Sequence, residues 1–78
     1  MSAKATYDSV FVETFLIEQT DVEIASTTTV SAWDSIGKLN LVAALEDAFD
    51  IELETEDIIA FNSYADGMNI LKKYGIEL

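Results

Sequence analysis

The sequence predicts an all-α protein, a four-helix bundle of three main helices and one short helix, with a long loop between the first and second helices. Apolar residues recur at spacings of three and four in several segments, which is the period of an amphipathic helix. Residues typical of helix caps mark the ends of these segments. The 78 residues suffice for a single domain, 1–78, and the chain has no cysteine to brace it. Packing of apolar side chains must therefore stabilise the fold.

The first helix is expected from about Lys4 to Glu18. Its apolar stripe is Tyr7, Val10, Phe11, Thr14, Phe15 and Leu16. From Gln19 to Asp34 the helical period disappears, and serines and threonines separate four apolar anchors: Val22, Ile24, Val30 and Trp33. Two short strands within this segment are an alternative on propensity alone. We expect instead an ordered loop, and loops of this length are often functional.

The second helix is expected to begin after Asp34, whose side chain can cap the free N–H groups of the first turn. It should run to about Phe49 or Asp50. Its expected apolar stripe is Leu39, Leu41, Val42, Leu45 and Phe49, and its expected outward residues are Lys38, Asn40, Glu46, Asp47 and Asp50.

Two further helices follow an extended connector. Thr55 is expected to cap a short helix over 56–61, and Ser63 to cap a last helix over 64–74. Gly75 suits the left-handed conformation that ends many helices.

Charge and composition narrow the classes of function. Fifteen acidic residues against four basic ones give a net charge of −11, which repels phosphate backbones and anionic lipid. We therefore expect neither nucleic acid nor membrane as partner, but proteins with basic patches. Acidity that serves only solubility is the alternative.

The chain has neither histidine nor cysteine, so it lacks the common general base and thiol nucleophile. We therefore expect no catalytic and no metal-binding residue. No secretory signal pattern is seen, so a cytoplasmic location is expected.

The run Trp33-Asp34-Ser35-Ile36, continued by Leu39-Asn40-Leu41-Val42-Ala43-Ala44-Leu45-Glu46-Asp47-Ala48-Phe49-Asp50-Ile51, resembles the acyl (peptidyl) carrier proteins of the discrete type. The resemblance covers essentially the whole chain in length and element order. It implies that Ser35 receives 4′-phosphopantetheine from coenzyme A through a phosphopantetheinyl transferase. The protein would then be a monomeric carrier, not an enzyme, that shuttles acyl or aminoacyl thioesters from a loading ligase to downstream biosynthetic enzymes.

The resemblance also assigns roles to individual residues. Asp34 would contact the transferase in addition to capping the helix. The docking face for partners would comprise Ile36, Asn40, Ala43, Glu46 and Asp47, extended by Glu52 and Asp57. An apolar cargo would enter between the second and third helices, with Leu41, Val42, Leu45, Phe61 and Met68 as walls. Trp33 is expected to be a packing anchor. Trp33 and Lys38 depart from the housekeeping fatty-acid carriers and favour a specialised pathway.

Two other hypotheses stand beside the carrier. The first is an acidic helical module for protein–protein interaction without a prosthetic group. The second is a cation-binding domain that uses the acidic run over 50–57, although this run has no glycine where an EF-hand loop needs its turn.

The charge distribution yields a prediction about salt. Lys38 is the only basic residue between Ala5 and Leu71, so carboxylate repulsion is poorly compensated. Moderate salt or divalent ions should screen this repulsion and raise the melting temperature. Thermal unfolding followed by circular dichroism at increasing salt checks this, and a melting temperature that stays flat or falls would contradict it.

Overall fold

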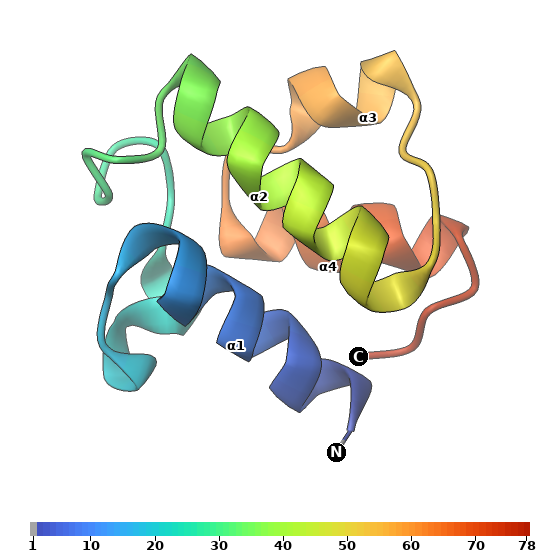
Figure 1. Cartoon of the computed structure of the whole chain (residues 1–78), viewed down its shortest axis with the longest axis horizontal. Coiled ribbons are helices and arrows are strands. Elements are labelled where there is room, and N and C mark those ends of the chain that lie inside the picture. Colours follow the sequence, from blue (N-terminus) through green and yellow to red (C-terminus); the bar gives the residue numbers. More distant parts are fainter. Residues whose placement is uncertain (1) are drawn as a thin grey trace.

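The computed structural model describes residues 2–78, and the regular elements of this part are all helices. Its elements are α1 (Ala3–Phe15), the 3₁₀-helix η1 (Gln19–Ile24), α2 (Ser35–Phe49), α3 (Thr55–Ala60) and α4 (Tyr64–Lys73) (Figure 1). Within residues 2–78 the only extended pairing is a single bridge between Ser26 and Ser63. The predicted all-α class is therefore confirmed. None of the helices in this described part is long and apolar enough to cross a membrane.

Helix α1 begins at the Ser2 cap, whose hydroxyl accepts a hydrogen bond from the Ala5 N–H at 3.1 Å. The predicted buried stripe is confirmed for Tyr7, Val10, Phe11 and Phe15. The helix ends three residues earlier than predicted, because Leu16 adopts the left-handed conformation with φ 54°. Its side chain is consequently 90% exposed, and its place in the predicted stripe is wrong.

An unexpected buried carboxylate joins α1 to α4. Asp8, which the helical pattern puts off the apolar stripe, is only 8% exposed. Its Oδ1 accepts from the Tyr64 hydroxyl at 2.6 Å, and its Oδ2 pairs with Lys4 at 3.0 Å. Burial and the hydrogen bond to Asp8 raise the pKa of Tyr64. The partners present on α1 and α4 thus offset the cost of burying this charge.

The connection between α1 and α2 is ordered by η1 and by hydrogen bonds to the α3–α4 junction. The N–H of Thr27 donates to the Asn62 carbonyl at 3.1 Å, and the N–H of Tyr64 donates to the Ala25 carbonyl at 2.9 Å. Three of the predicted anchors are buried: Val22, Val30 and Trp33. The fourth, Ile24, is 68% exposed, so that prediction is wrong.

Aromatic rings link the connection to the helices. The ring centroids of Phe11 and Trp33 are 5.5 Å apart, and Phe15 stacks on Trp33 with the centroids 5.2 Å apart. Phe61, just after α3, completes the group, with its ring centroid 5.8 Å from that of Trp33. Such pairs stabilise a core beyond the apolar area that they bury. The expectation that Trp33 is a packing anchor is confirmed.

Helix α2 starts as predicted. The Asp34 side chain accepts from the Gly37 N–H at 2.8 Å, which confirms it as the cap. Gly37 is buried against the Ala32 carbonyl oxygen, which a Cβ at this position would overlap. Leu41, Val42 and Leu45 are buried as expected.

Two details of the later helices differ from the predictions. Thr55 is the first residue of α3 rather than its cap, and Glu54 in the cap position makes no side-chain cap bond. In α2, Leu39 is 60% exposed although the stripe included it. The Ser63 cap of α4 is confirmed, since its hydroxyl accepts from the Asp66 N–H at 3.0 Å. Gly75, with φ 82°, ends α4 as expected.

The strained end of α1 leads to a stability prediction. Leu16→Gly should raise the free energy of unfolding by about 0.5–1 kcal/mol, because glycine relieves the left-handed strain and the exposed leucine contributes little packing. Such a change corresponds to a rise of a few degrees in melting temperature. Leu16→Ala is the matched control, since it also removes the side chain but keeps the strained Cβ. Equal effects of the two substitutions would contradict the backbone explanation.

Candidate functional site

Ser35 is the first residue of α2 and projects into solvent. Its side chain is exposed, and its hydroxyl has no hydrogen-bond partner among residues 2–78. Ser35 and Ile36 are the first two helical positions, whose N–H groups have no acceptor inside the helix. An anionic group on the Ser35 oxygen would therefore lie near unpaired N–H donors and the positive end of the helix dipole.

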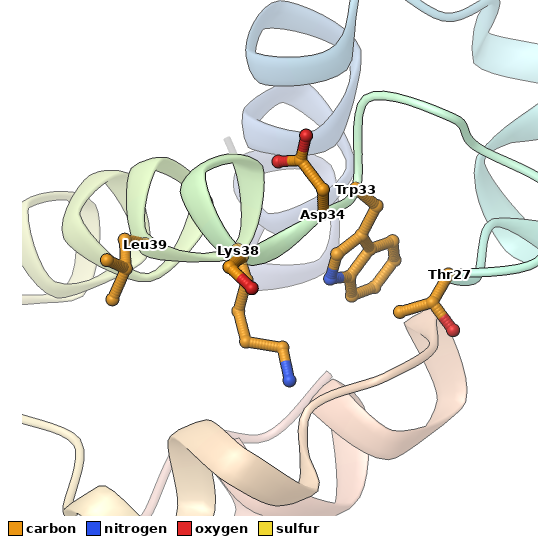
Figure 2. A pocket seen from close by; sticks show the side chains of 6 residues that line it. Thr27, Trp33, Asp34, Lys38 and Leu39 are labelled. Atoms are coloured by element: carbon orange, nitrogen blue, oxygen red, sulfur yellow. The ribbon is translucent and has the colours of Figure 1, made fainter.

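A cavity of about 400 Å³ opens beside Ser35 (Figure 2). Its wall comes from two parts of the chain, the connection before α2 and the first turns of α2 itself. The lining residues are Thr27, Trp33, Asp34, Ser35, Lys38 and Leu39. Figure 2 shows the Asp34 carboxylate turned away from the Lys38 side chain, in keeping with its cap bond to Gly37.

Lys38 crosses from α2 to the end of α3. Its Nζ donates to the Asn62 side-chain oxygen at 2.9 Å and to the Ile59 carbonyl at 3.4 Å. No carboxylate among residues 2–78 lies within 4.0 Å of this amine, whereas Lys4 and Lys73 are both ion-paired. Lys38 is half-buried rather than turned fully outward as expected, because its amine bridges α2 and the end of α3. A cation without a counterion lies next to Ser35 in a protein of net charge −11.

The Trp33 indole contains an unsatisfied donor. The residue is 3% exposed, and its Nε1 has no hydrogen-bond partner within the described part of the chain. A buried donor left unpaired costs roughly 1–3 kcal/mol. Figure 2 places this nitrogen on the ring edge that faces Lys38. Because this nitrogen is covered by its neighbours, an acceptor in the cavity relieves this cost only once a neighbouring side chain moves aside.

Most of the expected docking residues are exposed. Ile36 is 73% exposed, and Asn40, Ala43 and Asp47 on α2 and Glu52 in the connector are exposed as well. On α2 and α3, sequence reasoning missed two exposed apolar residues, Leu39 and Ile59, at 60% and 67%. The sequence held no signal for Ile59, because adjacent apolar residues of a helix can both be buried, as Leu41 and Val42 are.

Two of the expected docking carboxylates are engaged inside the molecule. Glu46 is half-buried and accepts from the Leu53 N–H at 2.8 Å, so it ties the connector to α2. Asp57 is buried, and its two oxygens accept from Lys73 and from the Tyr74 hydroxyl, each at 2.5 Å. The hydrogen bonds from Lys73 and Tyr74 hold the pKa of Asp57 below its usual value. The expectation of Asp57 as part of an exposed docking face is therefore wrong, because its carboxylate fastens α3 to the end of α4.

The expected cargo walls are core residues. Leu41, Val42, Leu45 and Phe61 are buried in one apolar cluster. Met68 is half-buried, packs against that cluster and lines a separate surface hollow with residues at the end of the chain. The structure therefore brings four of the five together and places the fifth at the edge.

Among residues 2–78, no three acidic side chains are grouped as ligands for a metal ion. No protein-family model matches this chain, and no curated protein matches it either.

The Asp57 cluster predicts a pH-dependent contribution to stability. The pKa of Asp57 in the folded protein lies below that of an unfolded aspartate, about 3.9. Its stabilising contribution is therefore fully present above that pH and is lost as the pH falls through the lowered pKa. Asp57→Asn should lower the free energy of unfolding at neutral pH, and the gap to the wild type should close in acid.

Urea unfolding at a series of pH values measures this gap. Asp47→Asn is the control, since Asp47 is an exposed aspartate on α2. A gap for Asp57→Asn that does not change with pH would show that the carboxylate charge contributes nothing.

Proposed function

We propose that this protein is a discrete acyl or aminoacyl carrier whose 4′-phosphopantetheine arm is attached to Ser35. The observation that carries the proposal is the exposed Ser35 hydroxyl, which has no hydrogen-bond partner within residues 2–78. Ser35 directly follows Asp34, the cap of α2, in the sequence. A transferase needs access to this oxygen, and nothing in residues 2–78 covers it. The resemblance over 33–51 is independent support from the sequence.

The proposal includes a particular arrangement of the helices. In it, α1, α2 and α4 are the main helices of a four-helix bundle, α3 is the short one, and the connection that contains η1 is the long loop. Trp33 at the end of this loop packs on Phe11 and Phe15 of α1 and so fixes the entry to α2. This anchoring supports a role of the loop in presenting Ser35.

Attachment of the arm is a substitution at phosphorus. The Ser35 oxygen forms a bond to the phosphorus that carries the pantetheine, the bond from this phosphorus to the bridging oxygen of the coenzyme A pyrophosphate breaks, and adenosine 3′,5′-bisphosphate leaves. The hydroxyl proton passes to a base of the transferase, since the chain has no histidine and the neighbouring Asp34 carboxylate is engaged with the Gly37 N–H. The free N–H groups at the start of α2 favour the phosphodiester that results.

The arm supplies a thiol, on which cargo is held as a thioester. The chain itself contributes attachment, presentation and docking. We propose that the exposed part of α2, with Ile36, Asn40, Ala43 and Asp47, docks on basic patches of the transferase, the loading ligase and downstream enzymes. The net charge of −11 supports such encounters by long-range attraction. A monomer in the cytoplasm, serving a specialised pathway, completes the proposal.

Incubation with coenzyme A, Mg²⁺ and a broad-specificity transferase tests the attachment. The intact protein should gain the mass of one phosphopantetheinyl group, and Ser35→Ala should gain none. Ser31→Ala is the matched control, since Ser31 is an exposed serine of the preceding loop, and it should be modified like the wild type. An unmodified wild-type mass, under conditions that label a known carrier, would refute the proposal and leave the acidic interaction module.

A further inference from the structure

The cavity beside Ser35 offers hydrogen-bond donors and a positive charge to whatever fills it. Lys38 contributes an amine without a carboxylate partner and Trp33 a buried N–H without an acceptor, whereas the Thr27 hydroxyl points away from Lys38 (Figure 2). The one carboxylate of the lining, Asp34, is bound to the Gly37 N–H and turned away (Figure 2). This set of groups fits a ligand that combines an anion with neutral oxygen acceptors.

The spacing on α2 relates Lys38 to the attachment point. Residues three apart on a helix lie on the same face, so the Lys38 side chain starts next to that of Ser35. The present acceptors of Lys38 are neutral, an amide oxygen of Asn62 at 2.9 Å and the Ile59 carbonyl at the longer distance of 3.4 Å. A phosphate oxygen is a stronger acceptor for an ammonium group than either. An anion on the Ser35 oxygen would therefore draw Lys38 to itself.

The geometry points to the arm itself as the occupant of this cavity, an inference that rests on the function proposed above. Lys38 pairs with the phosphodiester on Ser35, and the Trp33 indole N–H donates to a carbonyl or hydroxyl oxygen farther along the pantetheine chain. A cavity of about 400 Å³ is in the range of small-molecule sites. The arm supplies both kinds of acceptor that the lining lacks. Lys38 and Trp33 thus act as positioning residues that hold the first part of the arm against α2.

Trp33 is the only tryptophan of the chain, so a ¹⁵N-labelled sample gives one indole N–H signal and no assignment problem. Spectra are recorded of the unmodified protein and of the protein carrying the arm, with attachment verified by intact mass in every sample. In the wild type, attachment should shift the indole signal, slow its hydrogen exchange and produce nuclear Overhauser contacts between the indole proton and protons of the pantetheine chain.

Variants of Lys38 separate its role from general effects of modification. Lys38→Gln should lose more than half of the shift and weaken the Overhauser contacts, whereas Lys38→Arg, which keeps the charge, should retain them. Lys72→Gln removes a charge from an exposed lysine of α4 and should behave like the wild type. Circular dichroism of each variant verifies that the helices are intact.

The possible outcomes are distinct. If the mass of the wild type does not increase, the carrier function and this inference fail together. If the mass increases but the indole signal neither moves nor contacts the arm, the inference fails and the carrier function stands. A full shift in Lys38→Gln overturns the role of Lys38.

Discussion

The packing of Trp33 against Phe11, Phe15 and Phe61 is the contact on which the rest of the structure depends. It joins α1 to the end of the connection and to the residue after α3. The next residue, Asp34, caps α2, so the direction and starting point of that helix follow from where the indole is held. Ser35 owes its exposure to this arrangement, since the chain leaves the core at Trp33 and its helix begins at the surface.

Local chemistry explains which features could be predicted from the sequence. The Asp34, Ser63 and Gly75 caps depend on residues within a few positions, and all three are found as expected. Where a helix ends, and which side chains at the edge of its apolar face are buried, depends instead on residues that are distant in the sequence. Leu39 is exposed although its spacing matches a buried stripe, because the part of α2 that enters the core cluster is narrower than the apolar pattern. The left-handed turn at Leu16 has no sequence signal, since leucine seldom adopts it.

The two buried acids also show that the sequence does not reveal partners from distant parts of the chain. Asp8 and Asp57 look like ordinary surface carboxylates in a chain of fifteen acidic residues. The partners that join them to other helices lie 56 and 16 residues away, at Tyr64 and Lys73, so helical periodicity cannot reveal them. The structure thus divides the acids into two classes. Asp8 and Asp57 hold helices together, while Asp47 and Glu52 remain exposed and free to meet a basic partner.

Helix α3 is the element in which fold and function meet. Six residues are too few for a helix to be stable alone, so tertiary contacts must hold it. Polar ties lie at both of its ends: Asp57 binds Lys73 and Tyr74, and Lys38 binds the Ile59 carbonyl and Asn62. Neither tie uses the side chain of Ile59, which stays exposed. A partner that covers Ile59 therefore buries apolar surface while both ties remain in place. Docking on this side does not require α3 to move, whereas pairing of Lys38 with an anion on Ser35 removes one of the two ties.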